Sequence, residues 1–395
     1  MRWGSGLALA AALLAVLAAG MWLGGHPAKL PSQLRDVFVD DSAGLTAEAA
    51  ELIEDNYYRS VPQQQLTDSS LRGMVRGLRR RYRDRFSSYF SPELLKRFDE
   101  EISGRFSGVG LVVSRARRGL RVEQVLKGSP ASQAGIQGGD LVVSVDGSPI
   151  AGKPIAVVTA RIKGPEGTDV VLGVTRPPSR KQRQIRLTRA EVEVPVVNSG
   201  LRRVGGRRLG FVHLTAFSEA AHAALGRAVR RLKEKGAQGL VVDLRGNGGG
   251  LLEEAVLSAG IFLPKGEVVV STSSRTQGHA VYKSPGGAIW AGMPVVVLID
   301  GNTASAAEIL TAALADDAQA TVVGTHSFGK GVFQQEVPLS NGGALKLTVG
   351  EYFTPDGANL GGNPIRPDVQ AHDRLGTPAD EGLDRALEVL ARARG

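Results

Sequence analysis

A serine, a lysine and a glutamine follow one another within a short part of the chain. Ser305 lies in D-G-N-T-A-S-A-A-E-I-L (300–310), between an apolar run and a stretch with helical spacing. Lys330 lies in F-G-K-G-V-F-Q (328–334), which ends at Gln334. A serine hydroxyl is a poor nucleophile until a base removes its proton. Lysine acts as that base where burial lowers its pKa from about 10.4 towards about 7–8, because burial penalises the charged ammonium.

The serine also has a purely structural explanation. Asn, Thr and Ser residues that follow a strand often cap a helix, because their side-chain oxygens accept unpaired backbone N–H groups of its first turn. A single serine between a strand and a helix is a weak signal of a nucleophile. On 300–310 alone, a cap and a nucleophile both stay open.

A glycine-rich turn over 243–250 is a second chemical feature. D-L-R-G-N-G-G-G follows an apolar run and precedes a helical stretch. Glycines there let backbone N–H groups face a ligand or a developing oxyanion. The structural alternative is a tight strand-to-helix turn, although three consecutive glycines cost chain entropy without adding any packing.

Composition removes several other chemistries. The chain has no cysteine, which excludes a cysteine nucleophile, zinc–thiolate sites and disulfides together. It has six histidines, but no pair has metal-ligand spacing on a shared helix, and H-E-x-x-H is absent. We interpret His213 and His222 as structural residues and expect no metal and no organic cofactor. Composition alone leaves a Ser-His-Asp arrangement open.

The N-terminus has the pattern of an export signal. Residues 1–3 carry a positive charge, and 4–25 are uncharged and rich in Leu and Ala. Because about 20 apolar residues span a bilayer, segment 1–26 is either a cleaved signal peptide or an uncleaved anchor. Met21 stands where a lipidated cysteine would be, so lipidation is excluded. We expect an extracytoplasmic protein, in the cell envelope or periplasm, that is secreted or membrane-associated.

Basic residues outnumber acidic ones, 48 to 39, for a formal charge of +9. Two segments concentrate them: Arg72, Arg76, Arg79, Arg80, Arg81, Arg83 and Arg85, and then Arg176, Arg180, Lys181, Arg183, Arg186 and Arg189. Clustered cations neutralise nucleic-acid phosphates, but no zinc finger, RNA-binding aromatic signature or basic zipper accompanies them. We interpret both clusters as solvated basic faces, compatible with anionic lipid headgroups, and expect no nucleic-acid partner.

The hydrophobic pattern divides the chain into regions of different periodicity. Residues 27–44 have the composition of a linker, and 45–104 show helical spacing with a turn over 84–90. Short strands separated by turns over 105–190 indicate a compact β-rich domain. From 191 to 395, strands alternate with amphipathic helices, which predicts an α/β domain with helices covering a sheet.

Several motifs in order resemble a carboxy-terminal processing protease, a PDZ-containing serine protease of the tail-specific (S41) family. The matching segments are E-L-I-E-D-N-Y-Y (51–58), S-S-Y (87–89), G-V-G-L-V-V (108–113), G-S-P-A-S-Q-A-G-I-Q-G-G-D-L-V-V-S-V-D-G (128–147), V-V-D-L-R-G-N-G-G-G (241–250), T-A-S-A-A-E-I (303–309), F-G-K-G-V-F-Q (328–334), Y-F-T-P-D-G (352–357) and I-R-P-D-V (365–369). The resemblance implies a multidomain α/β protein: a helical N-terminal segment, a PDZ domain (a small β-barrel with two helices), and a crotonase- or ClpP-like protease core.

The resemblance assigns roles to individual residues. Ser305 matches the family's nucleophile, Lys330 its general base, and Gln334 the glutamine that orients the lysine. The backbone N–H groups of Gly249 and Ala306 match its oxyanion hole. With these partners, the nucleophile becomes the favoured interpretation of the serine.

Other residues near the serine take supporting roles. Gly248 and Gly250 stay open as alternatives to Gly249. We expect Asn302 or Thr303 to begin the helix. Three small side chains would leave room for a substrate backbone: Ala304, Ala306 and Ala307.

The segment 105–190 resembles a PDZ domain. Its carboxylate-binding loop matches Gly108, Val109, Gly110 and Leu111, where backbone N–H groups hold a terminal carboxylate beside an apolar pocket. Two side chains belong either to that pocket or to the strand core: Leu111 and Val113. The family implies that this domain selects substrates by their C-termini and gates access to the serine.

These features predict an exported serine endopeptidase that acts on proteins or peptides with accessible C-termini and cleaves near them. A non-catalytic PDZ adaptor is the main alternative, and a trypsin-like PDZ protease is the second. The physiological substrate stays open, as do a homo-oligomer and an activating partner.

Overall fold

The computed structural model describes most of the chain in two compact units. The described residues are 16, 20, 41–179, 181–374, 376, 377 and 379–393. The units are Met1–Ser91 with Glu336–Leu347, and Pro92–Gln335 with Thr348–Gly395. Apart from 16 and 20, the predicted export segment lies outside the described residues, as does most of the predicted linker. Within the described part, no helix has both the length and the apolar character needed to cross a membrane.

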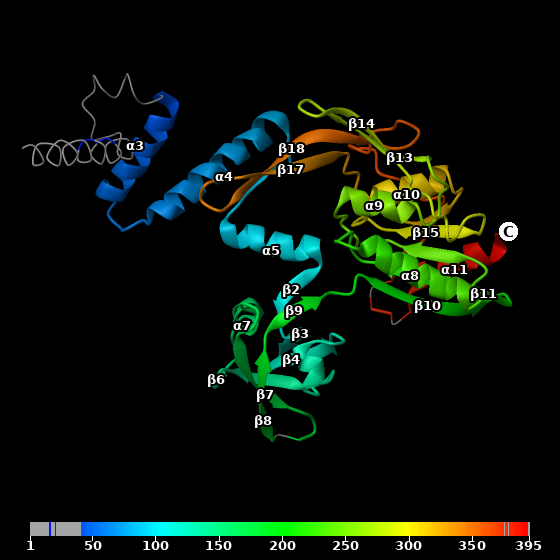
Figure 1. Ribbon diagram of the computed structural model, residues 1–395, viewed down its shortest axis with the longest axis horizontal. Coiled ribbons are helices and arrows are strands. Elements are labelled where there is room, and N and C mark those ends of the chain that lie inside the picture. Colours follow the sequence, from blue (N-terminus) through cyan, green and yellow to red (C-terminus); the bar gives the residue numbers. More distant parts are fainter. Residues whose placement is uncertain are drawn as a thin grey trace, which may run out of the picture. The chain divides into compact units, whose positions relative to one another are not determined.

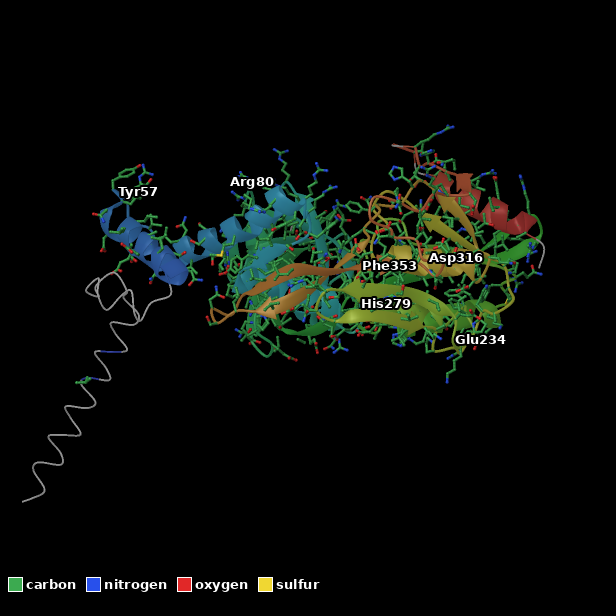
Figure 2. All side chains as sticks on the ribbon, turned by 90° about the horizontal axis from the view of Figure 1, so that it is seen from above. Tyr57, Arg80, Glu234, His279, Asp316 and Phe353 are labelled. Atoms are coloured by element: carbon green, nitrogen blue, oxygen red, sulfur yellow. The ribbon has the colours of Figure 1, made fainter. Side chains whose placement is uncertain are left out.

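Two helices and a short strand build the first unit. α3 (Asp41–Asn56) contacts α4 (Gln63–Tyr82), so the predicted helical character of this region is confirmed. The arginines of α4 are exposed, and Figure 2 shows Arg80 extending outward from this helix. β1 (Ser88–Phe90) pairs antiparallel with the first residues of β18 (Ala344–Phe353).

Tyr89 explains why the end of 84–90 is a strand rather than the predicted turn. Its ring is buried, and its hydroxyl donates to Asp68 Oδ1 at 2.7 Å. The same hydroxyl accepts from Asn341 Nδ2 at 2.9 Å. These contacts tie α4 and the 336–347 segment to the extended backbone of β1.

The PDZ-like part of the second unit is a sheet with two helices. Its strands run in the order β3-β4-β5-β7-β8, and β6 pairs with β5. The elements are β3 (Leu111–Ala116), β4 (Gly119–Val125), α6 (Pro130–Gln133), β5 (Leu141–Val145), β6 (Ser148–Pro149), α7 (Ile155–Ile162), β7 (Asp169–Thr175) and β8 (Gln182–Thr188). Alternate strand residues such as Val122, Val142 and Leu172 form its buried core. Leu111 and Val113 pack against this core while staying half-buried.

Three arginines of the second predicted basic face have specific partners inside this part. Arg176 donates to the buried Asp140 through both Nε (2.7 Å) and Nη2 (2.8 Å). Arg186 pairs with Asp169 at 3.1 Å. Arg189 donates to the carbonyls of 161, 162 and 169. Arg176 and Arg186 are nevertheless exposed, as a solvated basic face requires, whereas Arg189 is half-buried and holds neighbouring backbone segments.

Short elements flank the PDZ-like sheet. α5 (Pro92–Ser103) precedes β2 (Arg105–Gly108), and β2 pairs antiparallel with β9 (Ala190–Glu193). Both ends of the PDZ-like part are therefore joined in one two-stranded ladder.

A six-stranded sheet forms the core of the second unit. Its order is β10-β11-β12-β15-β16-β19, with an antiparallel β10–β11 hairpin and parallel pairs beyond it. The strands are β10 (Val197–Val204), β11 (Arg207–Leu214), β12 (Leu240–Asp243), β15 (Val295–Ile299), β16 (Thr321–Gly324) and β19 (Val369–Gln370). Parallel strands are joined by crossover connections that usually contain a helix. Parallel strands with both faces buried are continuously apolar, as the sequence V-V-V-L-I of β15 is.

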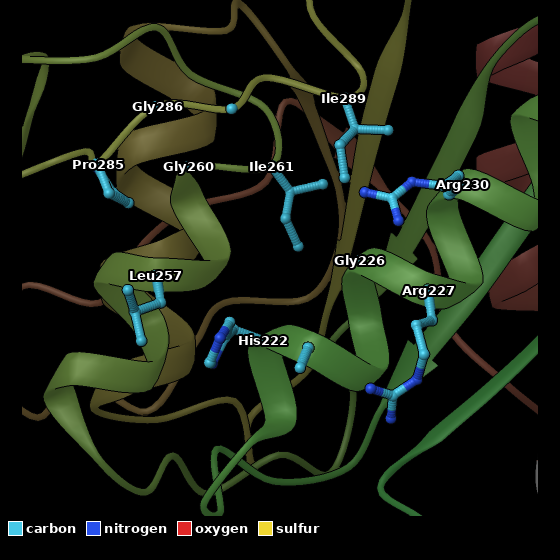
Figure 3. A pocket seen from close by; sticks show the side chains of 12 residues that line it. His222, Gly226, Arg227, Arg230, Leu257, Gly260, Ile261, Pro285, Gly286 and Ile289 are labelled. Carbon is cyan, nitrogen blue, oxygen red and sulfur yellow. The ribbon is translucent and has the colours of Figure 1, made fainter.

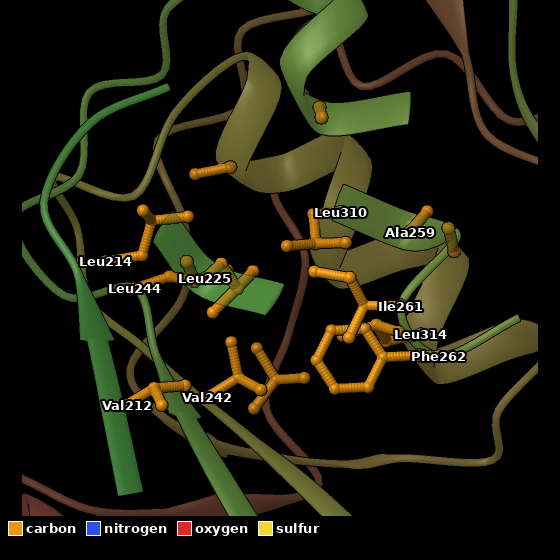
Figure 4. Packing of buried hydrophobic residues seen from close by; sticks show 14 of the residues in the cluster. Val212, Leu214, Leu225, Val242, Leu244, Ala259, Ile261, Phe262, Leu310 and Leu314 are labelled. Atoms are coloured by element: carbon orange, nitrogen blue, oxygen red, sulfur yellow. The ribbon is translucent and has the colours of Figure 1, made fainter. Parts of the chain in front are cut away.

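Helices cover both faces of this sheet (Figure 1). α8 (Ala221–Glu234), α9 (Leu252–Ala259) and α10 (Ala306–Asp316) pack on one face with Val242. α11 (Glu381–Arg392) packs on the other face with Val241, Val296 and Leu298. The buried residues on the side of α8, α9 and α10 form the larger core cluster, and Figure 4 shows its strand side chains meeting those of the helices. The predicted α/β fold is confirmed.

A smaller set of strands follows β12 in the same unit. β13 (Val268–Ser274) pairs antiparallel with β14 (Gly278–Lys283) and with the end of β18. β17 (Val332–Pro338) leads into β18. The register places Thr272 opposite Tyr352.

Candidate active site

The sheet topology brings the three predicted turns together. β12, β15 and β16 are adjacent and parallel, so the turns that follow them lie at the same edge of the sheet. The Ala304 N–H donates to the carbonyl of Asn247 at 3.0 Å. The Phe328 N–H donates to the carbonyl of Thr303 at 2.9 Å. The glycine-rich turn, the serine turn and the lysine turn are thus in direct contact.

Ser305 has a strained backbone at the start of α10. Its φ is 57° and its ψ is −120°, and its exposed fraction is 4%. A non-glycine residue in such a conformation costs about 1–3 kcal/mol, and strain of this kind concentrates at functional sites. The serine elbows of hydrolases combine the same sharp turn with a following helix. The backbone therefore favours a nucleophile over an ordinary cap.

The predicted helix start was wrong. α10 begins at Ala306, and Ser305 occupies the N-cap position itself. Thr303 instead closes the turn before it: its hydroxyl donates to the carbonyl of Leu244 at 2.9 Å and accepts the N–H of Asp300 at 3.0 Å. The Thr303 hydroxyl is thus used within the turn that precedes the helix, and it does not cap α10.

The small residues around the serine are packed rather than open. Ala306 and Ala307 are buried in the larger core cluster, and Ala304 is almost fully buried. Ala306 and Ala307 lie on α10, and their small size lets this helix approach the core closely. The expected room for a substrate backbone beside the serine stays a prediction.

Glu308 connects the serine turn with the lysine turn. Its side chain is completely buried. Oε2 accepts the backbone N–H groups of Ser305 and Lys330, each at 2.9 Å. Oε1 accepts the N–H of Gly329 at 2.7 Å and the hydroxyl of Ser327. One carboxylate thus holds the backbone of both predicted catalytic residues. The S-x-x-E spacing of a capping box, from Ser305 to Glu308, is the signal of this residue in the sequence.

Lys330 and Gln334 lie on the segment that enters β17. The side chain of Lys330 is half-buried. The side-chain amide of Gln334 donates to Thr348 Oγ1 at 3.3 Å. That contact anchors Gln334 to the neighbouring strand, while its predicted effect on the lysine stays a prediction.

Gly249 lies against Ser305, and no residue larger than glycine fits at position 249. A Cβ there would meet Ser305 Cβ and the Ala304 carbonyl oxygen at 2.8 Å each. Its φ of 102° also disfavours any other residue. The Gly249 N–H donates to Asn247 Oδ1 at 2.9 Å, so an oxyanion at this position would compete with that side chain. Ala306 is the first helical residue, where the backbone N–H has no acceptor within the helix.

Tyr352 begins the matched motif 352–357, but no role was predicted for it. Its side chain is 5% exposed and belongs to the larger core cluster. Burial raises the pKa of Tyr352 to about 12, and a hydrogen bond with the Ser305 side chain opposes part of that rise. β18 pairs with β13 at this residue, where Tyr352 lies opposite Thr272.

The predicted carboxylate loop joins β2 to β3. Gly108, Val109 and Gly110 are buried, and the Val109 carbonyl accepts the N–H of Ala131 at 2.9 Å. Gly110 has a φ of 78°, and a Cβ there would lie 2.1 Å from Ser129 Cβ. The close approach of α6 therefore requires glycine in this loop.

The histidines are held by structural contacts. His213 Nε2 lies 3.2 Å from the Arg245 carbonyl, and His222 Nδ1 lies 2.8 Å from Glu254 Oε2. His222 also lines a hollow of about 420 Å³ between α8 and α9 (Figure 3). None of the predicted catalytic residues lines that hollow. We therefore place the candidate active site at the sheet edge and not in the hollow.

Arg245 holds the glycine-rich turn to the start of α11. It donates to Asp243 Oδ2 at 2.7 Å, to Asp373 Oδ2 at 2.6 Å and to Asp380 Oδ1 at 2.9 Å. Burial alone would lower the pKa of Arg245, but hydrogen bonds to Asp243 and Asp380 raise it above its ordinary value. The guanidinium stays charged and fixes the entry to the turn.

Sequence comparisons match both parts of the second unit. Residues 208–371 match peptidase family S41, and 121–176 match a PDZ domain. A carboxy-terminal-processing protease of Bartonella bacilliformis is 34% identical over 324 residues, covering 80% of this chain and 72% of that protein. The carboxy-terminal processing protease CtpA of Bacillus subtilis is 33% identical over 323 residues, covering 82% and 67%.

A solved structure also matches. The photosystem II D1 C-terminal processing protease has a TM-score of 0.51 and 28% identity, covering 88% of this chain and 97% of that one. Fold and sequence together define a serine-type peptidase with a PDZ domain. The chain belongs to peptidase family S41, in the group of the carboxy-terminal processing proteases. The resemblance read from the motifs is confirmed.

Proposed function

We propose that the protein is an endopeptidase that binds a substrate C-terminus with its PDZ domain and cleaves near it with a Ser305–Lys330 dyad. The observation that carries the proposal is the strained backbone of Ser305, whose N–H shares one buried carboxylate oxygen with the N–H of Lys330. A strained serine fixed to a lysine-bearing turn is the arrangement that a serine–lysine mechanism needs.

Acylation breaks one amide bond and forms one ester. Neutral Lys330 Nζ takes the proton of Ser305 Oγ while Oγ bonds to the peptide carbonyl carbon. Negative charge collects on the carbonyl oxygen, facing the N–H groups of Ala306 and Gly249. The C–N bond then breaks, and Lys330 passes its proton to the leaving amine.

Deacylation repeats these steps with water. Lys330 takes a proton from water, the hydroxide oxygen bonds to the ester carbon, and Ser305 leaves with a proton returned by the lysine. Gln334 orients the lysine in both half-reactions. When the oxyanion binds, the Gly249 N–H gives up its hydrogen bond to Asn247 Oδ1 and donates to the substrate oxygen instead.

The PDZ domain supplies selectivity. The backbone of 108–111 holds the terminal carboxylate, and the neighbouring apolar surface receives the last side chain. The domain limits that we propose are 105–190 for the PDZ domain and 191–395 for the protease core. A substrate whose C-terminus is amidated should bind more weakly than the free acid.

The protein acts outside the cytoplasm in this proposal. Support comes from the charged start and long uncharged run of 1–26, which serves as a signal peptide or an anchor. Membrane association follows if the segment is retained. A homo-oligomer or an activating partner is compatible with this function, and neither is required by the chemistry.

Cleavage of an unstructured protein by wild type and two variants tests the function. Ser305→Ala and Lys330→Ala should each abolish cleavage, while Gln334→Ala should reduce it. A PDZ adaptor would show no cleavage by wild type and unaltered peptide binding in both variants. Loss of cleavage on substitution of a histidine, with activity kept in Ser305→Ala, would indicate a trypsin-like protease.

A further inference from the structure

We propose that the hollow between α8 and α9 is a binding site for a small amphipathic carboxylate, a molecule with an apolar body and one carboxylate group. None of the proposed catalytic residues lines this hollow. The site is therefore separate from the peptidase chemistry, and binding there does not depend on the role of Ser305.

The hollow has the size and the lining of a small-molecule site. Its volume is about 420 Å³, within the range of about 300–1,000 Å³ that is usual for ligand pockets. Leu257, Ile261 and Ile289 supply apolar side chains, and Figure 3 shows the two isoleucines lying between the helices. Binding an apolar group against these side chains is favourable, because it removes apolar surface from water.

Gly226 keeps this hollow open. It lies inside α8, where glycine weakens a helix relative to alanine. Close packing does not require a glycine there: an added Cβ would lie 3.7 Å from Ile261 Cδ1 and 3.8 Å from Ile289 Cδ1, which is ordinary van der Waals contact. The missing side chain thus leaves space that faces both isoleucines, and this space explains a glycine that costs helix stability.

The charged groups of the hollow are basic. Arg227 and Arg230 line it from α8, and Figure 3 shows the guanidinium of Arg230 directed towards Ile289. No acidic residue is among those that line it. Within the part of the chain that the structure describes, neither arginine forms an ion pair or a side-chain hydrogen bond. A guanidinium beside apolar side chains favours a carboxylate, to which it can donate two parallel hydrogen bonds.

A buried carboxylate holds the two helices of the hollow together. Glu254 of α9 accepts the backbone N–H groups of Ala220 and His222 at 2.9 and 2.8 Å, and its Oε2 also lies 2.8 Å from His222 Nδ1. These contacts join the start of α8 to α9, so the walls of the hollow are in place before a ligand arrives. A preformed site of this kind loses little conformational entropy on binding.

Titration calorimetry of the full chain with two carboxylates tests the site and distinguishes two sources of this chemistry. Octanoate represents an acyl chain, and N-acetyl-leucyl-leucine represents an apolar peptide terminus. We expect at least one of them to bind. The corresponding amide keeps the apolar body and lacks the charge, so it should bind about tenfold or more weakly.

Gly226→Leu should abolish binding, because its side chain would occupy the space that faces Ile261 and Ile289. Gly226→Ala is the control: its Cβ makes only ordinary contacts and alanine favours the helix, so its melting temperature should not fall below that of wild type. Peptide cleavage should be unchanged in both variants.

Arg230→Gln keeps the hollow open and removes one charge, so it tests the site even where Gly226→Leu fails to fold. It should weaken carboxylate binding about tenfold and leave binding of the amide unchanged. Arg231→Gln is the matched control, because Arg231 is also exposed on α8 and does not line this hollow.

The inference is overturned if neither carboxylate binds, or if Arg230→Gln binds octanoate and the dipeptide as tightly as Arg231→Gln does. Binding that is lost in Gly110→Ala and kept in Gly226→Leu would place the ligand in the PDZ loop and would also overturn it. Ser305→Ala, measured for cleavage in parallel, tests the proposed function separately.

Discussion

The backbone N–H of Ser305 and the Oε2 atom of Glu308 are 2.9 Å apart and form a buried hydrogen bond. The same oxygen accepts the N–H of Lys330 from a turn more than twenty residues later in the chain. The two proposed catalytic residues are thus fixed relative to each other through their main chains. Their side chains depend on the carboxylate for alignment.

Glu308→Gln should weaken this link in a defined way. The amide oxygen can still accept from Ser305 and Lys330, and the hydroxyl of Ser327 can turn to accept from the new NH₂ group. The Gly329 N–H would then face a donor, so we expect a loss of about 1–3 kcal/mol in the free energy of unfolding. We expect kcat to fall about tenfold, measured by peptide cleavage alongside chemical unfolding.

Glu253→Gln is the control for that change, because Glu253 is exposed on the neighbouring helix α9. It should leave both quantities within experimental error. Equal effects of the two substitutions would mean that the buried carboxylate does not align the site.

Gly249→Ala should disable the site more severely. The new Cβ would overlap Ser305 Cβ and the Ala304 carbonyl at 2.8 Å, in a backbone conformation that disfavours alanine. Overpacking and strain together predict a destabilisation of about 2–4 kcal/mol and a loss of kcat/KM of about 100-fold or more.

Gly248→Ala is the control, because it makes the same substitution at the adjacent glycine, where no clash is expected. A Cβ at Gly248 meets nothing within 4 Å, so activity should stay within about threefold of wild type. A greater loss in Gly248→Ala than in Gly249→Ala would move the proposed oxyanion contact to the earlier glycine.

The PDZ-like part should lose stability in acid through Asp140. Hydrogen bonds from Arg176 hold the pKa of this buried carboxyl below its ordinary value of 3.8. A lowered folded-state pKa adds stability that is fully present above the unfolded value and is lost as pH falls through the folded one. The loss should therefore begin near pH 4 and continue below it.

Arg176→Gln should remove this contribution. At pH 7 we expect a lower melting temperature than that of wild type, because the charged hydrogen bonds to Asp140 disappear. The difference between variant and wild type should shrink as pH falls below 4, measured by thermal unfolding at several pH values. A difference that stays constant down to pH 2 would contradict the linkage.

Peptide capture should depend on Gly110. A Cβ there would lie 2.1 Å from Ser129 Cβ, so Gly110→Ala should displace the loop and weaken binding of a free C-terminal peptide about tenfold or more. Gly128→Ala is the control, because its φ is also 78° but a Cβ meets nothing within 4 Å. Fluorescence anisotropy with acid and amidated peptides measures both. Equal weakening in the two variants would point to strain alone.

Sequence periodicity predicted the elements that carry local signals. The strand 295–299 was predictable, because a short continuous apolar run is typical of a buried parallel strand. β13 and β14 were not predicted. Polar residues and glycine interrupt both strands; β13 pairs with the distant β18, and β14 pairs with β13.

Some residues of the candidate site are predictable from local motifs, and others depend on contacts between distant segments. Ser305 and Lys330 follow from motifs and their order. Glu308 lay inside a recognised motif, but its link to the lysine turn requires a contact between distant segments. Tyr352 lies in a matched motif too, but its place opposite Thr272 follows from strand register, which a single sequence does not report. The strained φ of Ser305 likewise arises from the fold and not from local propensity.

The most direct test of the account is the site of covalent modification by a fluorophosphonate. Ser305 Oγ bonds to phosphorus as fluoride leaves, and Lys330 takes the serine proton. Mass spectrometry of the digested protein should find a single adduct on the peptide that contains Ser305. Ser305→Ala should show none, and Lys330→Ala should react about 100-fold more slowly. An adduct on another residue, or equal labelling of Ser305→Ala, would contradict the account.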